Sequence, residues 1–434
     1  MPERDRRRHR GGARGGPRAP ARGRVIPALL LAAVTLAPQD SVDRWAPLAR
    51  YLEERVAAHA FPGAVVAIGR RDTVLYLHAF GHLTYGAASP GARVRGRAAD
   101  RGLVTTRTVY DLASLTKVVG LTTAIMMLVE EGRVDLESPV RSYVQMFGYT
   151  HDSTITVRRL LTHSSGLPAW KPYWQRSHDR AEIFDLAAHE PIEYPTGTRT
   201  VYSDIGAINL TNMVETLTGE RLDRYLQRLL FGPLGMRDTR YRPPRSWLPR
   251  IAPTEMDTTY RHRLVHGEVH DENAFAMGGI SGHAGLFGTA EDLVRFAQMM
   301  LRGGTYPSSR SASRALVMGA HGPGLAGAAS ERDVDIGFLR AETVAAWTRR
   351  QDSAFSSRAL GWDTPDGQNS AGTRLSAHAF GHTGFTGTSI WMDPEQDLFV
   401  ILLTNRVHPT RENTLVFEVR RHVADLAVQI AGGR

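Results

Sequence analysis

The chain has 434 residues, 42% of them apolar, enough for one large two-lobed domain or two ordinary domains with a sizeable core. Its net charge of +9 suggests a nucleic acid or an anionic surface as partner, but nine arginines between Met1 and Arg24 face only two acids there. Residues 25–434 therefore carry only +2, which argues against a nucleic-acid-binding protein. Cysteine is absent, which excludes disulfides, a lipid-modified cysteine and thiolate catalysis.

Residues 1–38 have the pattern of an export leader or of an N-terminal anchor. An arginine-rich stretch precedes the 13-residue apolar run 25–37, and polar residues follow from Gln39. The run is short for a membrane span, which needs about 20 residues. Pro38 would hinder cleavage directly after Ala37, so a cleaved leader and an uncleaved anchor both stay open. The pattern predicts export to the periplasm or the exterior.

Apolar periodicity predicts the helices and strands that follow. A helix is expected at 43–60 and a hairpin from strands at 64–68 and 73–77, before a surface loop at 85–104. The next predicted helices span 116–131, 179–189, 204–218, 220–230 and 290–302.

The last part of the chain returns to strands. Residues 303–334 are rich in Ser, Gly and Ala and predict a flexible insertion, while strands at 387–392 and 398–404 precede a helix at 411–431. The order predicts a mixed α and β fold for residues 42–430. An antiparallel sheet from about 42–110 and 355–430 would be flanked by helices, with a helical lobe at about 111–354 and a cleft between the two.

The strongest chemical signal is Ser114-Leu-Thr-Lys117, at the start of an apolar predicted helix. Residues three apart share a helix face, so the Ser114 hydroxyl and the Lys117 amine can meet, and the helix N-terminus favours negative charge on an attacked carbonyl oxygen. Burial would lower the pKa of Lys117, and a neutral lysine can accept the serine proton. The chain contains only two lysines among its 53 basic residues. Since arginine cannot release a proton, a lysine at this position favours catalysis over coincidence.

Two further motifs follow in order, Tyr202-Ser-Asp204 and His382-Thr-Gly384. With Asp111-Leu-Ala-Ser-Leu-Thr-Lys117 they resemble the SxxK, YxN and KTG motifs of the β-lactamase and D,D-peptidase superfamily, and within it the class C β-lactamase-related serine hydrolases. The resemblance covers about residues 42–430 and implies the serine β-lactamase-like fold. It implies hydrolysis through a Ser114 acyl-enzyme, acting on D-alanyl peptides, small esters or β-lactams.

The same resemblance implies roles for individual residues. Lys117 and Tyr202 would share general-base and general-acid duty, and the backbone amides of Ser114 and Phe385 would form the oxyanion hole. Asp204, His382, Thr383, Gly384 and Phe385 would line the substrate site. Ser203 and Asp204 are good N-cap residues for the next helix, so Tyr202 would sit on a loop that faces the cleft. Gly384 would let substrate approach the backbone closely.

Two positions depart from the family pattern. Asp204 replaces an amide with a carboxylate, which could keep Lys117 charged and move base duty to Tyr202, or could simply cap the next helix. His382 replaces a lysine that holds the substrate carboxylate in many relatives, and imidazole is only partly charged near neutral pH. This second change weakens the case for a β-lactamase more than the case for a peptidase or an esterase.

Other readings are weaker. His262, His266 and His270 recur every four residues, but Gly267 and the alternating pattern around it favour a hairpin or loop over a zinc site. No metal and no organic cofactor is expected. The main rival is a non-hydrolytic receptor of the same fold that binds penicillin or wall peptides. The oligomeric state is left open.

Overall fold

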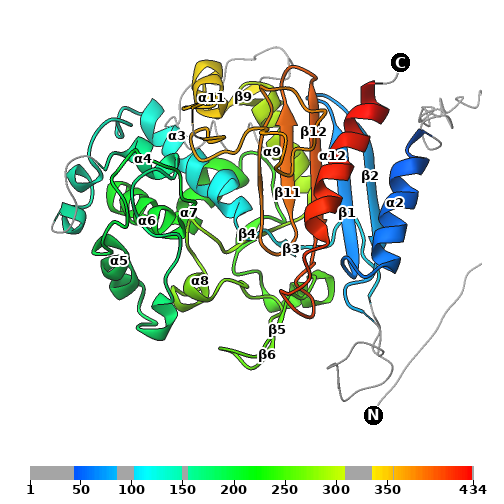
Figure 1. The fold of residues 1–434 in the computed structure, drawn as a ribbon, viewed down its shortest axis with the longest axis horizontal. Helices are drawn as coiled ribbons and strands as arrows, with labels where there is room; N and C mark the ends of the chain where they lie inside the picture. Colours follow the sequence, from blue (N-terminus) through cyan, green and yellow to red (C-terminus); the bar gives the residue numbers. More distant parts are fainter. Residues whose placement is uncertain (1–43, 86–101, 149–154, 308–334, 355, 433–434) are drawn as a thin grey trace, which may run out of the picture. The chain divides into compact units, whose positions relative to one another are not determined.

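Residues 44–85, 102–148, 155–307, 335–354 and 356–432 are described by a computed structural model, and they contain a five-stranded antiparallel sheet (Figure 1). The strand order is β10-β11-β12-β1-β2. The strands are β1 (Gly63–Gly69), β2 (Val74–Gly81), β10 (Phe380–Thr383), β11 (Ser389–Asp393) and β12 (Leu398–Thr404). Because β1 pairs with β12, both ends of the described chain contribute to one sheet, as the sequence predicts.

Both faces of this sheet are covered. On one face, Val66 and Ile68 of β1 pack in a cluster with α2 (Ala46–Ala57) and α12 (Val416–Gly432). On the other face, α9 (Ala290–Leu301) packs against β1, β11 and β12. Strands buried on both faces read as continuous apolar runs, which is why β1 and β12 show no polar alternation. α9 falls in the range expected for the helical lobe, yet it covers the sheet.

A helical region lies beside the sheet (Figure 1). Its helices are α3 (Thr123–Glu130), α4 (Val157–Leu161), α5 (Arg180–Ala188), α6 (Asp204–Thr218), α7 (Leu222–Leu226), α8 (Glu272–Ala276) and α11 (Ala341–Thr348). The short strands β3 (Tyr110–Asp111), β7 (Leu286–Gly288) and β4 (Arg240–Tyr241) form a second sheet, and two pairs join β5 (Met256–Asp257) to β6 (Arg263–Leu264) and β8 (Thr305–Pro307) to β9 (Asp335–Gly337).

Several boundaries differ from the sequence-based prediction. The helix expected at 116–131 opens with a π-helical segment, Lys117–Thr122, and the one expected at 220–230 ends in another, Gln227–Phe231. β11 begins at Ser389 because the chain turns at Gly387, whose φ of 118° disfavours any other residue. The last helix begins at Val416, after a loop that carries Arg411.

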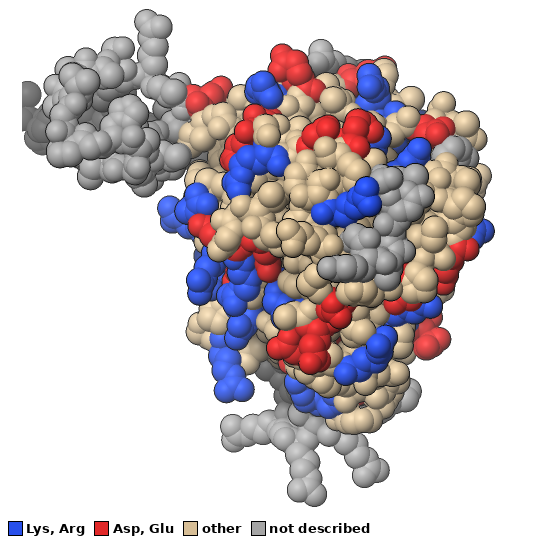
Figure 2. Space-filling model, turned by 90° about the vertical axis from the view of Figure 1, so that its left-hand side faces the viewer, with Lys and Arg blue, Asp and Glu red and all other residues tan. Residues whose placement is uncertain are grey.

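Some expectations concern residues outside the described ranges. They are the leader at 1–38, most of the loop at 85–104, and the insertion beyond residue 307. No helix in the described ranges is long and apolar enough to cross a membrane. Over the face that Figure 2 shows, acidic and basic side chains are interleaved.

Candidate active site

Ser114 stands directly after a strained turn that follows β3. Ala113 has a φ of 47°, a conformation that costs energy for a residue with a Cβ atom. Asp111 holds this turn: its Oδ1 accepts from the Ala113 amide at 2.9 Å, and its Oδ2 accepts from the His270 amide at 2.7 Å. Burial raises the pKa of Asp111, and these amide hydrogen bonds oppose the rise. The surrounding structure thus fixes the position of the Ser114 hydroxyl.

Gly384 lets the turn after β10 press against the Ser114 segment. A Cβ atom on Gly384 would lie 2.5 Å from the Leu112 carbonyl oxygen and 2.1 Å from Thr388 Oγ1. Gly384 is therefore needed because the protein's own backbone approaches it closely, whereas the sequence analysis expected Gly384 to make room for substrate. Among the described residues, no backbone acceptor is paired with the amide of Ser114 or of Phe385. Both amides are free to bind an oxyanion, as the resemblance implies.

Lys117 lies in the π-helical segment with its amine surrounded by acceptors. Its Nζ lies 3.1 Å from Ser114 Oγ, 2.9 Å from the His283 carbonyl oxygen and 2.6 Å from Asp204 Oδ1. Burial lowers the pKa of Lys117, but the charge and hydrogen bond of Asp204, together with those of Tyr202, outweigh burial and the pKa lies above its usual value. The expectation of a neutral lysine is therefore wrong for the resting site: Lys117 is an ammonium ion.

Tyr202 precedes α6 and faces the same amine. Its ring lies 4.9 Å from Lys117 Nζ, and its buried hydroxyl lies close enough to Lys117 and Ser114 to interact with both. Burial raises the pKa of Tyr202, although the Lys117 charge opposes the rise. The helix cap is Ser203, whose Oγ accepts from the Gly206 amide. Asp204 is the first residue of the helix, so its carboxylate is free to pair with Lys117.

His382 lies on β10 with its ring buried. Its Nδ1 is 2.8 Å from the Thr383 carbonyl oxygen, so Nδ1 carries the proton and Nε2, which is buried without a partner, is a bare acceptor. Burial and then the charges of Arg358 and Lys117 hold the pKa of His382 well below its usual value. His382 is therefore neutral near pH 7, and the partly charged imidazole expected from the sequence is not present.

Arg358 is a site residue that the sequence analysis missed. Its guanidinium lies 5.1 Å from the centre of the Tyr202 ring, and its Nη1 is buried without a hydrogen bond. No described acid forms an ion pair with it. Arg358 belongs to no motif that could have marked it among the many arginines of this chain. The β-bridge between Arg358 and Asp363, which itself pairs with Gly381 of β10, brings Arg358 to the site.

A cavity of about 230 Å³ brings the predicted residues together. Its lining consists of Ser114, Tyr202, Arg358, Asp363, His382, Thr383, Gly384, Phe385, Arg406, Phe417 and Arg420. Asp204, expected to touch substrate, does not line it. A neighbouring cavity of about 530 Å³ shares Asp363, Thr383, Phe417 and Arg420 and continues along α12, past Asn369 and Asp425.

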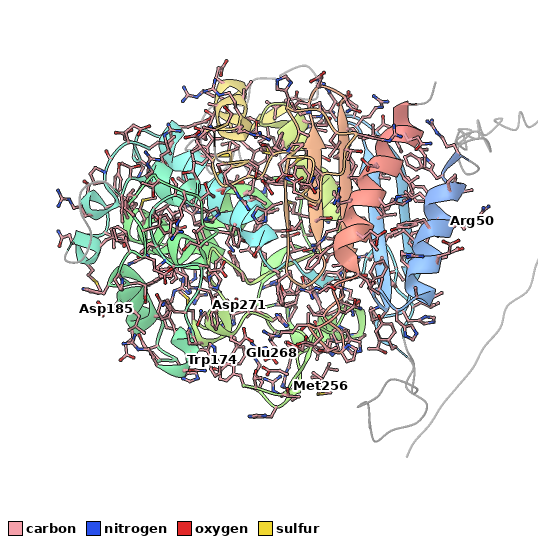
Figure 3. All side chains as sticks on the ribbon, in the orientation of Figure 1. Arg50, Trp174, Asp185, Met256, Glu268 and Asp271 are labelled. Atoms are coloured by element: carbon pink, nitrogen blue, oxygen red, sulfur yellow. The ribbon has the colours of Figure 1, made fainter. Side chains whose placement is uncertain are left out.

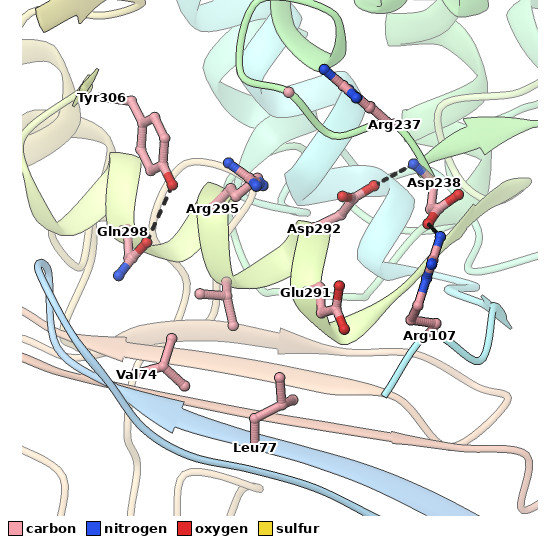
Figure 4. A pocket seen from close by; sticks show the side chains of 12 residues that line it. Val74, Leu77, Arg107, Arg237, Asp238, Glu291, Asp292, Arg295, Gln298 and Tyr306 are labelled. Atoms are coloured by element: carbon pink, nitrogen blue, oxygen red, sulfur yellow. Dashed lines mark hydrogen bonds and ion pairs between the residues drawn. The ribbon is translucent and has the colours of Figure 1, made fainter. Parts of the chain in front are cut away.

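A larger cavity lies elsewhere in the described part of the chain. It measures about 660 Å³ and lies between β2 and α9, where Val74 and Leu77 face Arg295 and Asp292 (Figure 4). None of its lining residues is a serine, a threonine or a lysine. It therefore offers no hydroxyl–lysine pair of the kind found at Ser114, and the smaller cavity at Ser114 is the candidate site.

The three spaced histidines hold structural positions. His270 Nε2 lies 2.9 Å from Glu255 Oε2, and His266 Nε2 lies 2.9 Å from the Ile251 carbonyl oxygen. The His163 ring lies 4.7 Å from the Tyr202 ring, centre to centre, in a tilted arrangement, and His283 joins Asp271 to Ser281 through its two ring nitrogens. In the described ranges, no group of three or more His, Asp or Glu side chains could hold a metal ion.

Comparisons with known proteins identify the family of the chain. The sequence model of the Beta-lactamase family matches residues 48–425. A protein of Escherichia coli O157:H7 that bears the name D-alanyl-D-alanine carboxypeptidase is 30% identical over 401 residues, covering 85% of this chain and 83% of the relative. A Bacillus subtilis strain 168 protein named N-acetylmuramyl-L-alanine amidase is 33% identical over 401 residues, covering 84% and 82%. A solved penicillin-binding-protein homologue from Caulobacter crescentus has a similar fold, with a TM-score of 0.65 at 19% identity over 89% of this chain and 98% of that one.

Proposed function

The chain belongs to the Beta-lactamase family and is a hydrolase of that family, and from this premise we propose that it cleaves wall-type D-alanyl peptides through an acyl-enzyme on Ser114. The observation that carries the proposal is the 3.1 Å contact between Lys117 Nζ and Ser114 Oγ, beside a cavity that Ser114 and Tyr202 both line. A nucleophile, a proton-transfer partner and two unpaired amides converge there, which is the arrangement that acyl transfer requires.

The proposed reaction has two halves. Ser114 Oγ passes its proton to the amine of Lys117 and attacks the peptide carbonyl carbon. The amides of Ser114 and Phe385 bind the carbonyl oxygen, which becomes negative. The leaving amine takes up a proton and departs, and an ester to Ser114 remains. A water molecule then repeats the attack on that ester and releases the acid. Tyr202, which holds its proton, is placed to donate it to the leaving amine.

Arg358 supports a substrate with a free carboxylate. A D-alanyl peptide ends in such a group, and the unpaired guanidinium beside Ser114 can bind it through two parallel hydrogen bonds. Small esters and β-lactams present a carbonyl to the same serine, so they are further candidate substrates. The name of the B. subtilis relative suggests a muramyl amide, and the neighbouring 530 Å³ cavity favours that bulkier alternative.

Labelling and turnover test the proposal together. We expect a fluorophosphonate to add one label to the protein, p-nitrophenyl acetate to turn over, and a peptide ending in D-Ala-D-Ala to release D-alanine. Ser114→Ala should abolish all three. Ser281→Ala is the matched control, because Ser281 contacts His283 and is fully buried, and the variant should keep the label. Full labelling of the Ser114→Ala protein would refute the assignment.

Two rival outcomes are separable in the same assays. A receptor of this fold would form at most one stable adduct per chain and would show no turnover. An amidase would release lactyl-linked sugar from a muramyl peptide and leave D-Ala-D-Ala intact. We also propose export, on the pattern of residues 1–38 alone, and fractionation of cells that express the whole chain tests it.

A further inference from the structure

The ion pair between Lys117 and Asp204 poses a problem for proton transfer. The Lys117 side chain is 4% exposed, and its three contacts are with Ser114 Oγ, the His283 carbonyl oxygen and Asp204 Oδ1. An ammonium ion has no lone pair, so it can accept the Ser114 proton only if it gives up one of its own.

Only one of these three contacts can take that proton. Ser114 is the nucleophile, and the His283 oxygen belongs to a peptide group, which is a very weak base. Tyr202 interacts with the amine through its ring at 4.9 Å and also through its hydroxyl, but burial raises the pKa of Tyr202, so this hydroxyl already carries a proton. The Asp204 carboxylate lies 2.6 Å from the amine.

We propose that Asp204 stores the Lys117 proton while Ser114 is acylated. One proton moves from Lys117 Nζ to Asp204 Oδ1 as another moves from Ser114 Oγ to Nζ, and the Ser114 oxygen bonds to the substrate carbonyl carbon. The site then holds an ammonium ion, a neutral carboxylic acid and the oxyanion, so the total charge is unchanged. When the leaving amine departs it takes a proton from the site, and Asp204 returns its proton to Lys117.

The other charged groups near Lys117 are already engaged or are cations. Asp271, at the start of α8 (Figure 3), accepts from the Ala274 amide and lies 2.8 Å from His283 Nε2. It therefore orients His283, whose carbonyl oxygen faces the amine. Arg358 is a cation. Burial, and then the positive charge of Arg358, lower the pKa of both His163 and His382 and keep both rings neutral. Asp204 is thus the acceptor in direct contact.

This inference rests on the proposed function, and the pH dependence of Ser114 acylation by p-nitrophenyl acetate tests it. In the wild-type protein Asp204 can accept the Lys117 proton at any pH at which it is ionised. The rate of Ser114 acylation should therefore be flat on the alkaline side of neutral pH. In Asp204→Asn the reaction must wait for a neutral Lys117. We expect the rate to follow the deprotonation of Lys117 in this variant, rising about tenfold per pH unit below the pKa of Lys117 and levelling off above it.

Ser203→Ala is the matched control, because it removes the cap of the same helix but keeps the carboxylate. It should lower stability and leave the pH profile unchanged. An Asp204→Asn protein with the wild-type pH profile and only a lower rate would mean that Asp204 merely positions Lys117. If the wild-type protein is never acylated at Ser114, the proposed function fails first, which is a different result.

A spectroscopic measurement does not depend on activity. The chain contains only Lys117 and Lys171, so protein labelled with ¹⁵N-lysine shows two side-chain amine signals, and the exposed Lys171 serves as the reference. We expect Lys117 to be an ammonium ion across the neutral range in the wild-type protein. It should lose its proton within this range in Asp204→Asn, because burial then acts without the opposing carboxylate. A neutral Lys117 in the wild-type protein would overturn the inference.

Discussion

Arg358 is the single residue with the most direct expected effect on substrate choice. Replacing it with Gln keeps some hydrogen bonding but removes the charge that faces Ser114. A lost charged hydrogen bond costs about 1.5–3 kcal/mol, so KM for a D-Ala-D-Ala peptide should rise roughly 10- to 100-fold. The kcat/KM for p-nitrophenyl acetate should change far less. Steady-state kinetics with the two substrates measure the difference.

Two comparisons sharpen that prediction. Because His382 is neutral, KM for the peptide should stay flat from about pH 5.5 to pH 8 in the wild-type protein. Arg349→Gln, a change in a neighbouring arginine outside the lining of the cavity, should leave both substrates unaffected. If KM for the peptide rises as the pH increases past 6.5, His382 and not Arg358 binds the substrate carboxylate.

At the scale of elements, the site depends on how β10 meets the turn before Ser114. In Gly384→Ala, the new methyl group would overlap Thr388 Oγ1 and the Leu112 carbonyl oxygen, which themselves form a hydrogen bond of 3.0 Å. Overpacking of this kind costs about 1–3 kcal/mol, and the displaced turn should also slow acylation of Ser114. Thermal unfolding and the rate of fluorophosphonate labelling report the two effects.

Gly337→Ala in β9 is the control for this change. Nothing lies within 4 Å of a Cβ atom there, so the midpoint of unfolding and the labelling rate should both stay near the wild-type values. If Gly384→Ala behaves in the same way, the close approach does not hold the nucleophile.

At the scale of the whole molecule, a buried ion cluster joins the loop before α12 to the helical region. Glu255 accepts from Arg411 and lies 2.9 Å from His270 Nε2. Burial raises the pKa of Glu255, but the hydrogen bonds from His270 and Arg411 outweigh it and lower the pKa to about 2. A lowered pKa means that this contribution to stability is complete above about pH 4.5 and is lost as the pH falls toward 2.

Glu255→Gln should therefore lower the free energy of unfolding by about 3 kcal/mol at pH 7 and by much less near pH 2. Urea unfolding across this pH range measures the change. Glu395→Gln is the matched control, since Glu395 forms a similar 2.9 Å pair with His378 but both side chains are exposed. Its effect should be below about 1 kcal/mol at every pH. If both variants lower the free energy of unfolding by the same amount, burial does not strengthen the contribution of Glu255 to stability.

The sequence by itself determined the sheet shared by both chain ends and the meeting of Ser114 with Lys117. Both follow from short-range periodicity, since apolar runs specify buried strands and residues three apart share a helix face. The order of the three motifs was also enough to predict Ser114, Tyr202 and residues 382–385 at the cavity. Asp204 and Lys117 do not line it, and no motif marked the other lining residues, which are Arg358, Asp363, Arg406, Phe417 and Arg420.

The tertiary structure alone decided the charges in the site. Lys117 is charged because Asp204 reaches it, and His382 is neutral because it is buried beside Arg358 and Lys117. A pKa depends on desolvation and on neighbours brought close by folding, and neither can be read from local sequence. The same reason explains why the sequence did not mark Arg358, which folding brings to 5.1 Å from the centre of the Tyr202 ring.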